Sequence, residues 1–408
     1  MTTGPISEVV FQLDGKEVAR SSESPWTRDV DFGAEYTPHE LVARALDGKG
    51  GEIARARQWI NLPRPPAEVE ILIEKDRAGK LAAARLTWAS RMGPHPTRVS
   101  LTFDGGELPL DIVHRAKLPV FDASTTHVLT AQIEFAGDVR GRADLVLGGG
   151  SSDEAGSELT AVPIRSADGK MPSVERLRGR LVRNGAALTV TGVEQGPATL
   201  VLVRDLESQP IAWRLRAMLL RNPFGDPTKL DREDRLQVQW PVLREVSDVE
   251  GANLLFEASQ MYSGSKVSIL SLVTQVGYPG KNLQPRRFAD AVAVAGLQAA
   301  RYYSPRAVVV VLGAFDKDAS RQNPAAVERY LERLHVPLHV WSFAGEGPRA
   351  PAAAWGSFAD VSTSARLKTA IERVEQDLRS QSIVWVEGRY LPQEITLVDK
   401  GDGITIAQ

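Results

Sequence analysis

Polar side chains that could bind a cation or another protein follow two strongly apolar segments of the chain. Asp205 and Glu207 come directly after the run 198–203, and Asp316 comes after the run 307–312. Carboxylate oxygens are the ligands that Mg²⁺ and Mn²⁺ prefer, and paired carboxylates can also serve as acid and base in hydrolysis. The same groups can form a polar rim that contacts a partner protein. The candidate rim comprises Asp205, Glu207, Ser208, Gln209, Lys281, Asn282, Phe315 and Asp316.

Signatures of catalysis are missing from the sequence. Residues 277–282 contain a Gly-Lys pair but lack the spacing and the hydroxyl residue of a phosphate-binding loop. The chain contains neither a Gly-x-Ser-x-Gly elbow nor a His-Glu-x-x-His segment. His335 and His339 are four residues apart, but Pro337 lies between them, where a helix that could aim both rings at one metal is excluded. We therefore expect structural histidines and no enzymatic activity.

The amino-acid composition narrows the classes of molecule that the protein could bind. The 408 residues contain 49 Lys and Arg against 51 Asp and Glu, so the net charge of -2 gives no footprint for nucleic acid. The apolar runs are too short to span a bilayer. The absence of cysteine suits an oxidising compartment, and we expect a periplasmic or extracellular protein. Residues 1–5 lack a signal-peptide pattern, so a cytoplasmic location and a removed leader both stay open.

An alternating series of strands and helices is expected to position the candidate residues. Apolar, β-branched runs of this length indicate strands covered on both faces, and the intervening segments have helical periodicity. Such alternation predicts an open, doubly wound parallel sheet, in which ligands bind beyond the carboxyl ends of the strands. The expected strands are 198–203, 236–246, 307–312 and 336–343, and the expected helices are a segment around Trp213, 288–301, 324–334 and 365–378.

Four segments of this region resemble the von Willebrand factor A (VWA) family. Residues 200–209 resemble its first strand and loop, 288–295 the helix after its Gly-Gly-Thr loop, and 306–312 and 336–342 its later strands. More narrowly, the layout is similar to bacterial VWA-related proteins in which small Ig-like modules precede the VWA domain. The resemblance implies a Rossmann-like α/β domain with a metal-ion-dependent adhesion site.

Most of the ligands that the family uses at that site are replaced in this chain. Asp205 keeps the position of the first aspartate, but Glu207 and Gln209 stand where the family's Asp-x-Ser-x-Ser motif has serines. Lys281 lies in the segment that should supply a threonine, and the family's Asp-Gly is replaced by Gly-Ala-Phe at 313–315. Longer side chains and a positive charge disfavour a small cation. We therefore expect a degenerate site without a cofactor.

Three functions are compatible with this set of residues. The preferred hypothesis is a non-enzymatic adhesion or scaffold protein that presents the loops of the VWA-like domain to a protein partner. The first alternative is a cation-dependent adhesin that binds Mg²⁺ or Mn²⁺ through Asp205 with Glu207 or Asp316. The second is a hydrolase of unrecognised type that uses the same three carboxylates. No residue pattern names the partner.

The N-terminal half contains a repeated pattern of short strands. The segment 10–18, with an Asp-Gly turn, is echoed at 100–108, and 39–43 is echoed at 127–131. Asp-Gly between alternating apolar residues is a hairpin signal. Two echoes in the same order predict two antiparallel, Ig-like β-sandwich modules. The strands expected in the first include 26–32 and 40–46.

These patterns divide the chain into five parts. Three prolines within 63–66 indicate a stiff linker, so cleavage at 61–66 is expected to release a folded module. The segments 383–385 and 394–404 are expected to form a terminal hairpin. The predicted parts are Ig-like modules at 1–63 and 67–165, a bridging β-hairpin at 166–196, the VWA-like domain at 197–380 and a C-terminal β-hairpin at 381–408.

Overall fold

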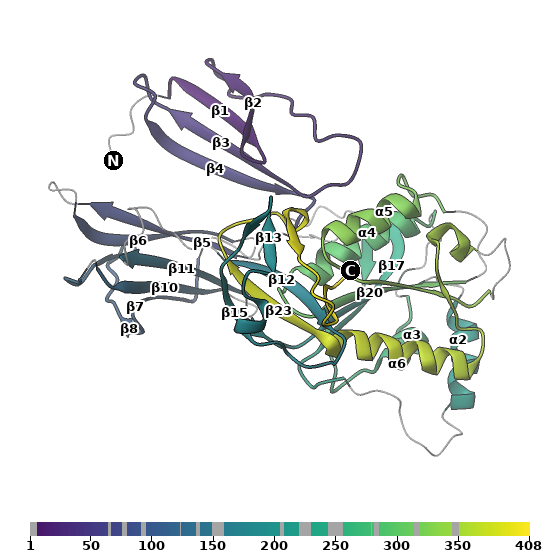
Figure 1. The fold of residues 1–408 in the computed structure, drawn as a ribbon. Coiled ribbons are helices and arrows are strands. Elements are labelled where there is room, and N and C mark those ends of the chain that lie inside the picture. The colour runs from purple at the N-terminus through teal and green to yellow at the C-terminus, as the bar shows by residue number, and fades with distance from the viewer. Residues whose placement is uncertain are drawn as a thin grey trace.

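The computed structural model divides into three β-modules and one α/β domain (Figure 1). We call residues 6–63 module 1, 67–148 module 2, 159–194 together with 381–408 module 3, and 198–380 the α/β domain. No helix among the described residues is long and apolar enough to cross a membrane. The structure describes residues 6–63, 67–75, 80–90, 95–122, 124–135, 139–148, 159–204, 208–219, 230–243, 256–278, 280, 285–313, 318–344 and 351–408.

Module 2 is a sandwich of two antiparallel sheets, as expected for an Ig-like module. One sheet has the order β5-β6-β9 and the other β11-β10-β7-β8. Alternate residues of both sheets meet in one core, where Leu86, Leu101 and Leu129 are almost completely buried. The strands are β5 (Ala67–Lys75), β6 (Leu81–Ser90), β7 (Arg98–Phe103), β8 (Gly106–Glu107), β9 (Arg115–Lys117), β10 (Thr126–Phe135) and β11 (Val139–Gly148).

Module 1 repeats only one sheet of that sandwich. Its order, β2-β1-β3-β4, corresponds strand by strand to β8-β7-β10-β11. The strand expected at 26–32 does not form, because this stretch is a loop between β2 and β3. The predicted sandwich at 1–63 is therefore a single sheet in the described residues. Its strands are β1 (Glu8–Leu13), β2 (Lys16–Ser21), β3 (His39–Leu46) and β4 (Glu52–Ile60).

The repeat predicted from the sequence is confirmed at the hairpin turns. Asp14 and Asp104 both adopt positive φ angles, 51° and 49°. Each aspartate accepts a hydrogen bond from the backbone N–H of the residue that follows a histidine, and its second oxygen lies 2.7 Å from Nδ1 of that histidine, His39 or His127. The two histidines thus fasten equivalent turns in separate modules, which agrees with a structural role.

Module 3 is discontinuous, and this changes the predicted division of the chain. Residues 159–166 pair with 381–387 over seven antiparallel positions, so one sheet crosses both the 165/166 and the 380/381 boundaries. The expected terminal hairpin is absent from the described residues, because β24 pairs with β13 whereas β25 pairs with β12. The two sheets of module 3 have the strand orders β15-β23-β12-β25 and β14-β13-β24. Its strands are β12 (Leu159–Ser166), β13 (Leu181–Arg183), β14 (Ala186–Ala187), β15 (Val190–Glu194), β23 (Gln381–Glu387), β24 (Ile395–Leu397) and β25 (Ile404–Ile406).

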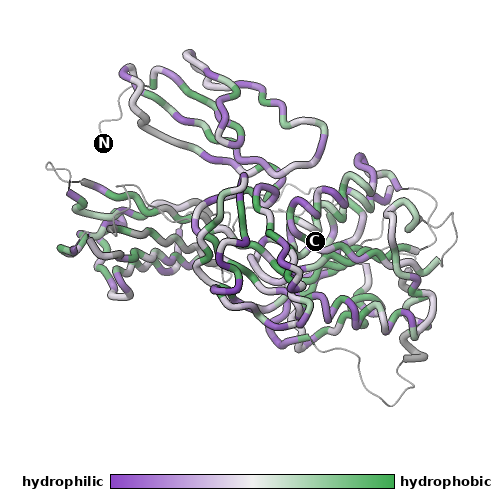
Figure 2. The backbone as a smooth tube through the Cα atoms, viewed as in Figure 1, coloured by the Kyte–Doolittle hydropathy of each residue, from purple (hydrophilic) through white to green (hydrophobic). Residues whose placement is uncertain are grey.

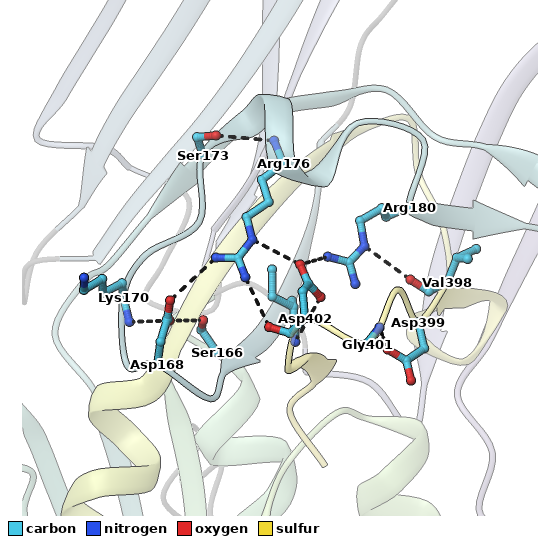
Figure 3. A network of polar contacts seen from close by, with 11 residues as sticks. Ser166, Asp168, Lys170, Ser173, Arg176, Arg180, Val398, Asp399, Gly401 and Asp402 are labelled. Carbon is cyan, nitrogen blue, oxygen red and sulfur yellow. Dashed lines mark hydrogen bonds and ion pairs between the residues drawn. The ribbon is translucent and has the colours of Figure 1, made fainter.

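A polar network joins the two chain segments of module 3 (Figure 3). The carboxylate of Asp402 accepts hydrogen bonds from Arg180, at 2.8 Å, and from Arg176, at 3.1 Å. The Arg180 side chain is fully buried. Because a buried guanidinium needs a paired anion, this ion pair holds the turn before β25 against the segment that includes α1 (Val174–Leu177) and follows β12.

The α/β domain is inserted between β15 and β23 and has the doubly wound architecture predicted from the sequence. The sheet order β18-β17-β16-β20-β21-β22 corresponds to 3-2-1-4-5-6, with an antiparallel edge strand. Figure 2 shows hydrophobic strands at the centre of this domain. The strands are β16 (Thr199–Arg204), β17 (Arg235–Leu243), β18 (Phe256–Ala258), β19 (Tyr262–Ser263), β20 (Arg306–Leu312), β21 (Leu338–Ser342) and β22 (Ala359–Asp360).

Helices cover both faces of this sheet. α2, α3 and α6 pack against the face that contains Leu200, and α4 and α5 against the face that contains Val201. The helical segments are α2 (Ser208–Leu219), α3 (Ile269–Thr274), α4 (Phe288–Ala300), α5 (Pro324–Arg333), α6 (Ser364–Ser380) and the 3₁₀ turns η1 (Pro351–Trp355) and η2 (Pro392–Glu394).

Contacts are made next to the segment that was expected to be a stiff linker with few contacts across it. The Tyr330 hydroxyl of α5 donates a hydrogen bond to the backbone oxygen of Asn61. Arg333, also in α5, binds Glu35 of module 1 at 2.6 Å, and Leu62 packs against the core of the α/β domain. Module 1 therefore packs against α5 of the α/β domain near this segment. Release of module 1 by cleavage at 61–66 would break these contacts. Residues 64–66 lie outside the described part.

Candidate functional site

The carboxyl ends of β16 and β20 meet at the centre of the parallel sheet. Arg204, the last residue of β16, pairs with Val311 near the end of β20. The chain leaves these two neighbouring strands toward helices on opposite faces, α2 after β16 and α5 after β20, which makes this position the switch point of the fold. In doubly wound sheets ligands bind in the crevice at this point. The tertiary structure therefore places side by side the ends of the two strands that precede two of the three segments with predicted candidate residues.

Six of the eight predicted rim residues lie outside the described part of the chain. These are Asp205 and Glu207 in the loop after β16, Lys281 and Asn282 before α4, and Phe315 and Asp316 in the loop after β20. Gln209 is the second residue of α2, and its side chain is not described. Ser208, at the start of α2, is fully buried. Ser208 therefore cannot itself contact a partner, in contrast to its predicted place in the rim.

Arg204 is a buried charged residue near the candidate segments that the sequence patterns did not single out. Its side chain is fully buried at the carboxyl end of β16. Its guanidinium donates hydrogen bonds to the backbone oxygens of Leu272, at 3.1 Å, and Val273, at 2.7 Å, and also to that of Val276. These carbonyls belong to the last turn of α3 and the residues after it, where a helix leaves oxygens without partners. The positive charge also suits the negative end of the helix dipole.

Arg204 places a fixed positive charge at the carboxyl end of β16. Arg204 is adjacent in sequence to Asp205, the only residue that retains a metal-ligand position of the VWA family. A buried guanidinium close to a divalent cation repels it strongly, because the interior screens charges poorly. The described residues contain no group of three or more His, Asp or Glu side chains suited to a metal ion. Asp205, Glu207 and Asp316 lie outside the described residues.

The loop after β20 is anchored to the first turn of α4. Asp318 accepts hydrogen bonds from the backbone N–H groups of Phe288, at 2.9 Å, and Ala289, at 3.3 Å. The residue at the N-cap position, Arg287, makes no capping bond with its own side chain. Asp318 therefore acts as a cap supplied from another loop, in the way that aspartate normally stabilises a helix N-terminus. Its carboxylate is used for this purpose and is not available as a cation ligand.

The two histidines four residues apart have different surroundings. His335 is buried, and this burial, together with the neighbouring Arg306, lowers the pKa of His335 to about 3. His339 lies 2.9 Å from Asp377 of α6, measured from Nε2 to the carboxylate. Asp377 also binds Arg165 of β12 and so joins the α/β domain to module 3. Both histidines therefore have structural roles, as expected from the sequence.

A cavity of about 700 Å³ lies at the opposite, amino edge of the sheet. Its lining includes Asp234, which accepts hydrogen bonds from the N–H groups of Ala198 and Asp231, both at 2.7 Å. Burial raises the pKa of the Asp234 carboxyl. The Asp234 carboxylate therefore holds the entry into β16, and the described lining also contains Asp231, Glu233 and Glu375.

Comparisons with known proteins give only distant likenesses. No family model and no curated protein matches the chain. Among solved structures, fibronectin(III)-like modules of CbhA from Clostridium thermocellum are 14% identical, cover 36% of this chain and 79% of their own, and have a TM-score of 0.17. Proximal thread matrix protein 1 from the mussel byssus is 13% identical, covers 48% of this chain and 49% of its own, and has a TM-score of 0.31.

An archaeal VWA protein is a further weak neighbour. The ArnB paralog VWA2 from Sulfolobus acidocaldarius is 11% identical, with 67% of this chain and 53% of that chain covered and a TM-score of 0.25. The chain thus spans about half the length of the mussel and archaeal proteins. All three TM-scores are well below 0.5.

Proposed function

We propose that the chain is a non-enzymatic protein-binding protein, located outside the cytoplasm, whose contact surface is the carboxyl edge of the α/β domain. The observation that carries the proposal is that the α/β domain is attached to module 3 through the amino edge of its sheet. Gln381, the first residue of β23, hydrogen-bonds both the N–H and the oxygen of Arg306, at the amino end of β20. Module 3 therefore holds the amino edge of the sheet. Because parallel strands all run away from that edge, the switch-point loops lie at the far end.

Two features favour binding without a metal. Glu207 and Gln209 stand where the VWA family has hydroxyl ligands, and Arg204, the residue before Asp205 in the sequence, is a buried positive charge at the end of β16. In this proposal Asp205, Glu207 and Asp316 are surface carboxylates that contact a partner. Lys281 and Asn282 contribute complementary polar groups, and Phe315 contributes an apolar anchor.

The metal question can be answered by thermal unfolding. A cation that binds only the native state raises the melting temperature in proportion to the logarithm of its concentration. We expect wild type and Asp205→Ala to show no rise in melting temperature with millimolar Mg²⁺ or Mn²⁺. A rise of several degrees in wild type that Asp205→Ala abolishes would replace this proposal with the cation-dependent adhesin.

The binding surface can be tested by capture of partners on the immobilised full chain. The double variant Glu207→Lys with Asp316→Lys changes the carboxyl edge, and Glu233→Lys is a matched control because Glu233 is exposed at the amino edge. We expect the double variant to lose the proteins captured from an extract of the source organism, and the control to retain them with or without EDTA. Equal capture by both variants would contradict the proposal. Hydrolytic activity lost in the double variant would favour an enzyme instead.

A further inference from the structure

Arg333 of α5 binds three consecutive residues of the loop between β2 and β3 in module 1. Its guanidinium donates hydrogen bonds to the backbone oxygen of Tyr36, at 3.2 Å, and to the hydroxyl of Thr37, at 2.6 Å. The same guanidinium forms the ion pair with Glu35, whose other carboxylate oxygen lies 3.7 Å from Arg329. We call these contacts of Arg333 with residues 35–37 the latch.

Module 3 supplies a second set of contacts to module 1. Gln393 of η2 donates a hydrogen bond of 2.7 Å to the backbone oxygen of Pro38. The Arg389 guanidinium lies 3.6 Å from the Glu40 carboxylate and 5.2 Å from the centre of the Trp59 ring. These residues of module 1 lie where β3 begins and β4 ends, because these two strands pair antiparallel. The latch and module 3 therefore hold the same end of the sheet of module 1.

The described contacts at this end are mainly polar. Tyr36 and Leu62 are the described residues of module 1 that pack against the core of the α/β domain, and both stay partly exposed. The side chain of Glu35 is 54% exposed and that of Arg333 is 30% exposed. Exposed ion pairs contribute little, because water and salt screen them. Among the described residues, the amide oxygen of Gln393 is buried without a hydrogen-bond donor, so the contact is also imperfectly paired.

We propose that module 1 docks reversibly and that ionic strength opens the latch. Domains of one chain move relative to one another unless the interface between them is large and hydrophobic. The described part of this interface consists mainly of ion pairs and hydrogen bonds. In dilute salt these contacts hold module 1 in the position that Figure 1 shows. In concentrated salt the latch opens, and module 1 stays attached only through the covalent chain.

The latch is separate from the surface proposed for partner binding. It involves α5 and the loop before β3, whereas the proposed binding surface is formed by the loops at the carboxyl edge of the sheet. The two proposals can therefore fail independently.

Single-molecule energy transfer between two dyes measures the docked and undocked populations in the full chain. The chain has no cysteine, so Lys49→Cys and Gln376→Cys provide two unique attachment sites. Lys49 is exposed in the turn between β3 and β4, and Gln376 is exposed on α6. We expect the ratio of undocked to docked molecules to rise about threefold to tenfold between about 50 and about 500 mM NaCl, because salt screens exposed ion pairs. A single population that salt leaves unchanged overturns the proposal.

The variant Arg333→Gln tests whether Arg333 closes the latch. The neutral side chain cannot form the ion pair, so the ratio of undocked to docked molecules should rise about tenfold in dilute salt, as expected for the loss of charged hydrogen bonds. Arg373→Gln is a matched control, because Arg373 is exposed on α6 and this helix packs on the face of the sheet opposite to α5. The control should behave like wild type. An unchanged ratio in Arg333→Gln, or an equal rise in both variants, overturns the proposal.

Small-angle X-ray scattering checks the opening without dyes. The radius of gyration of wild type should rise with salt at constant mass, and that of Arg333→Gln should already be raised in dilute salt. Hydrogen exchange of α5 and β3 should stay slow in every sample, which distinguishes undocking from unfolding. A radius that stays constant in both proteins, or fast exchange that accompanies every rise, overturns the reversible latch.

Discussion

Modules 1 and 2 share the same four-stranded sheet, the same hairpin turn and the same Asp–His contact, but only module 2 has a second sheet. The side chains of the shared sheet follow the same apolar alternation in both modules. Their burial differs because β5, β6 and β9 cover one copy and the described residues of module 1 supply no counterpart. An apolar alternation therefore predicts which face of a sheet belongs to a core, whereas the free energy gained depends on what covers that face.

The largest difference between the modules should appear at Leu129 and its equivalent, Leu41. Leu129→Ala removes a fully buried side chain and should destabilise module 2 by about 2–5 kcal/mol. Leu41→Ala removes a partly exposed side chain and should cost module 1 about half as much or less. Native-state hydrogen exchange of β10 and β3 measures the two changes separately. Equal costs would mean that the face of module 1 that contains Leu41 is covered as completely as its equivalent in module 2.

Substitutions in the two hairpin turns should cost the two modules equal amounts of stability, in contrast to the substitutions of the two leucines. Gly15 and Gly105 have φ angles of 76° and 81°, where a residue with a Cβ is strained. A Cβ at either position meets no atom within 4 Å, so the cost is backbone strain alone. We expect Gly15→Ala and Gly105→Ala each to destabilise the module that contains it by about 1–2 kcal/mol. Hydrogen exchange of the two hairpins compares them, and a clearly unequal pair would show that the turns are not equivalent.

The smallest effect should be a pH dependence of module 2. The hydrogen bond with Asp104 raises the pKa of His127. A histidine whose pKa is higher in the folded state than in the unfolded state stabilises the fold. This stability is fully present at a pH below the unfolded-state pKa, about 6.5, and is lost as the pH rises through the folded-state pKa. Hydrogen exchange of β10 should therefore show lower stability at about pH 8.5 than at about pH 5.5, after correction for the intrinsic rate. His127→Gln should reduce this difference, and an unchanged difference would assign it to other groups.

Several features of this protein were determined by the sequence alone. The apolar runs that became β16 and β20, with helical periodicity between the later strands, predicted a doubly wound sheet because only that arrangement covers such strands on both faces. The repeated Asp-Gly turns predicted equivalent hairpins, since the positive φ angles of such a turn favour these residues. These are local signals, and the structure follows them closely. The expected helix 288–301, for example, is α4 at Phe288–Ala300.

Only the tertiary structure decided the features that depend on distant partners. Residues 159–166 look like an ordinary strand, and nothing local shows that they pair with 381–387 across an entire inserted domain. In the sequence, Arg204 is only one residue of the segment 200–209, and nothing there indicates that its guanidinium contacts the end of α3. Strand pairing and the burial of a charge are decided by which groups meet in space, because the favourable contacts are formed between segments that the sequence does not place together.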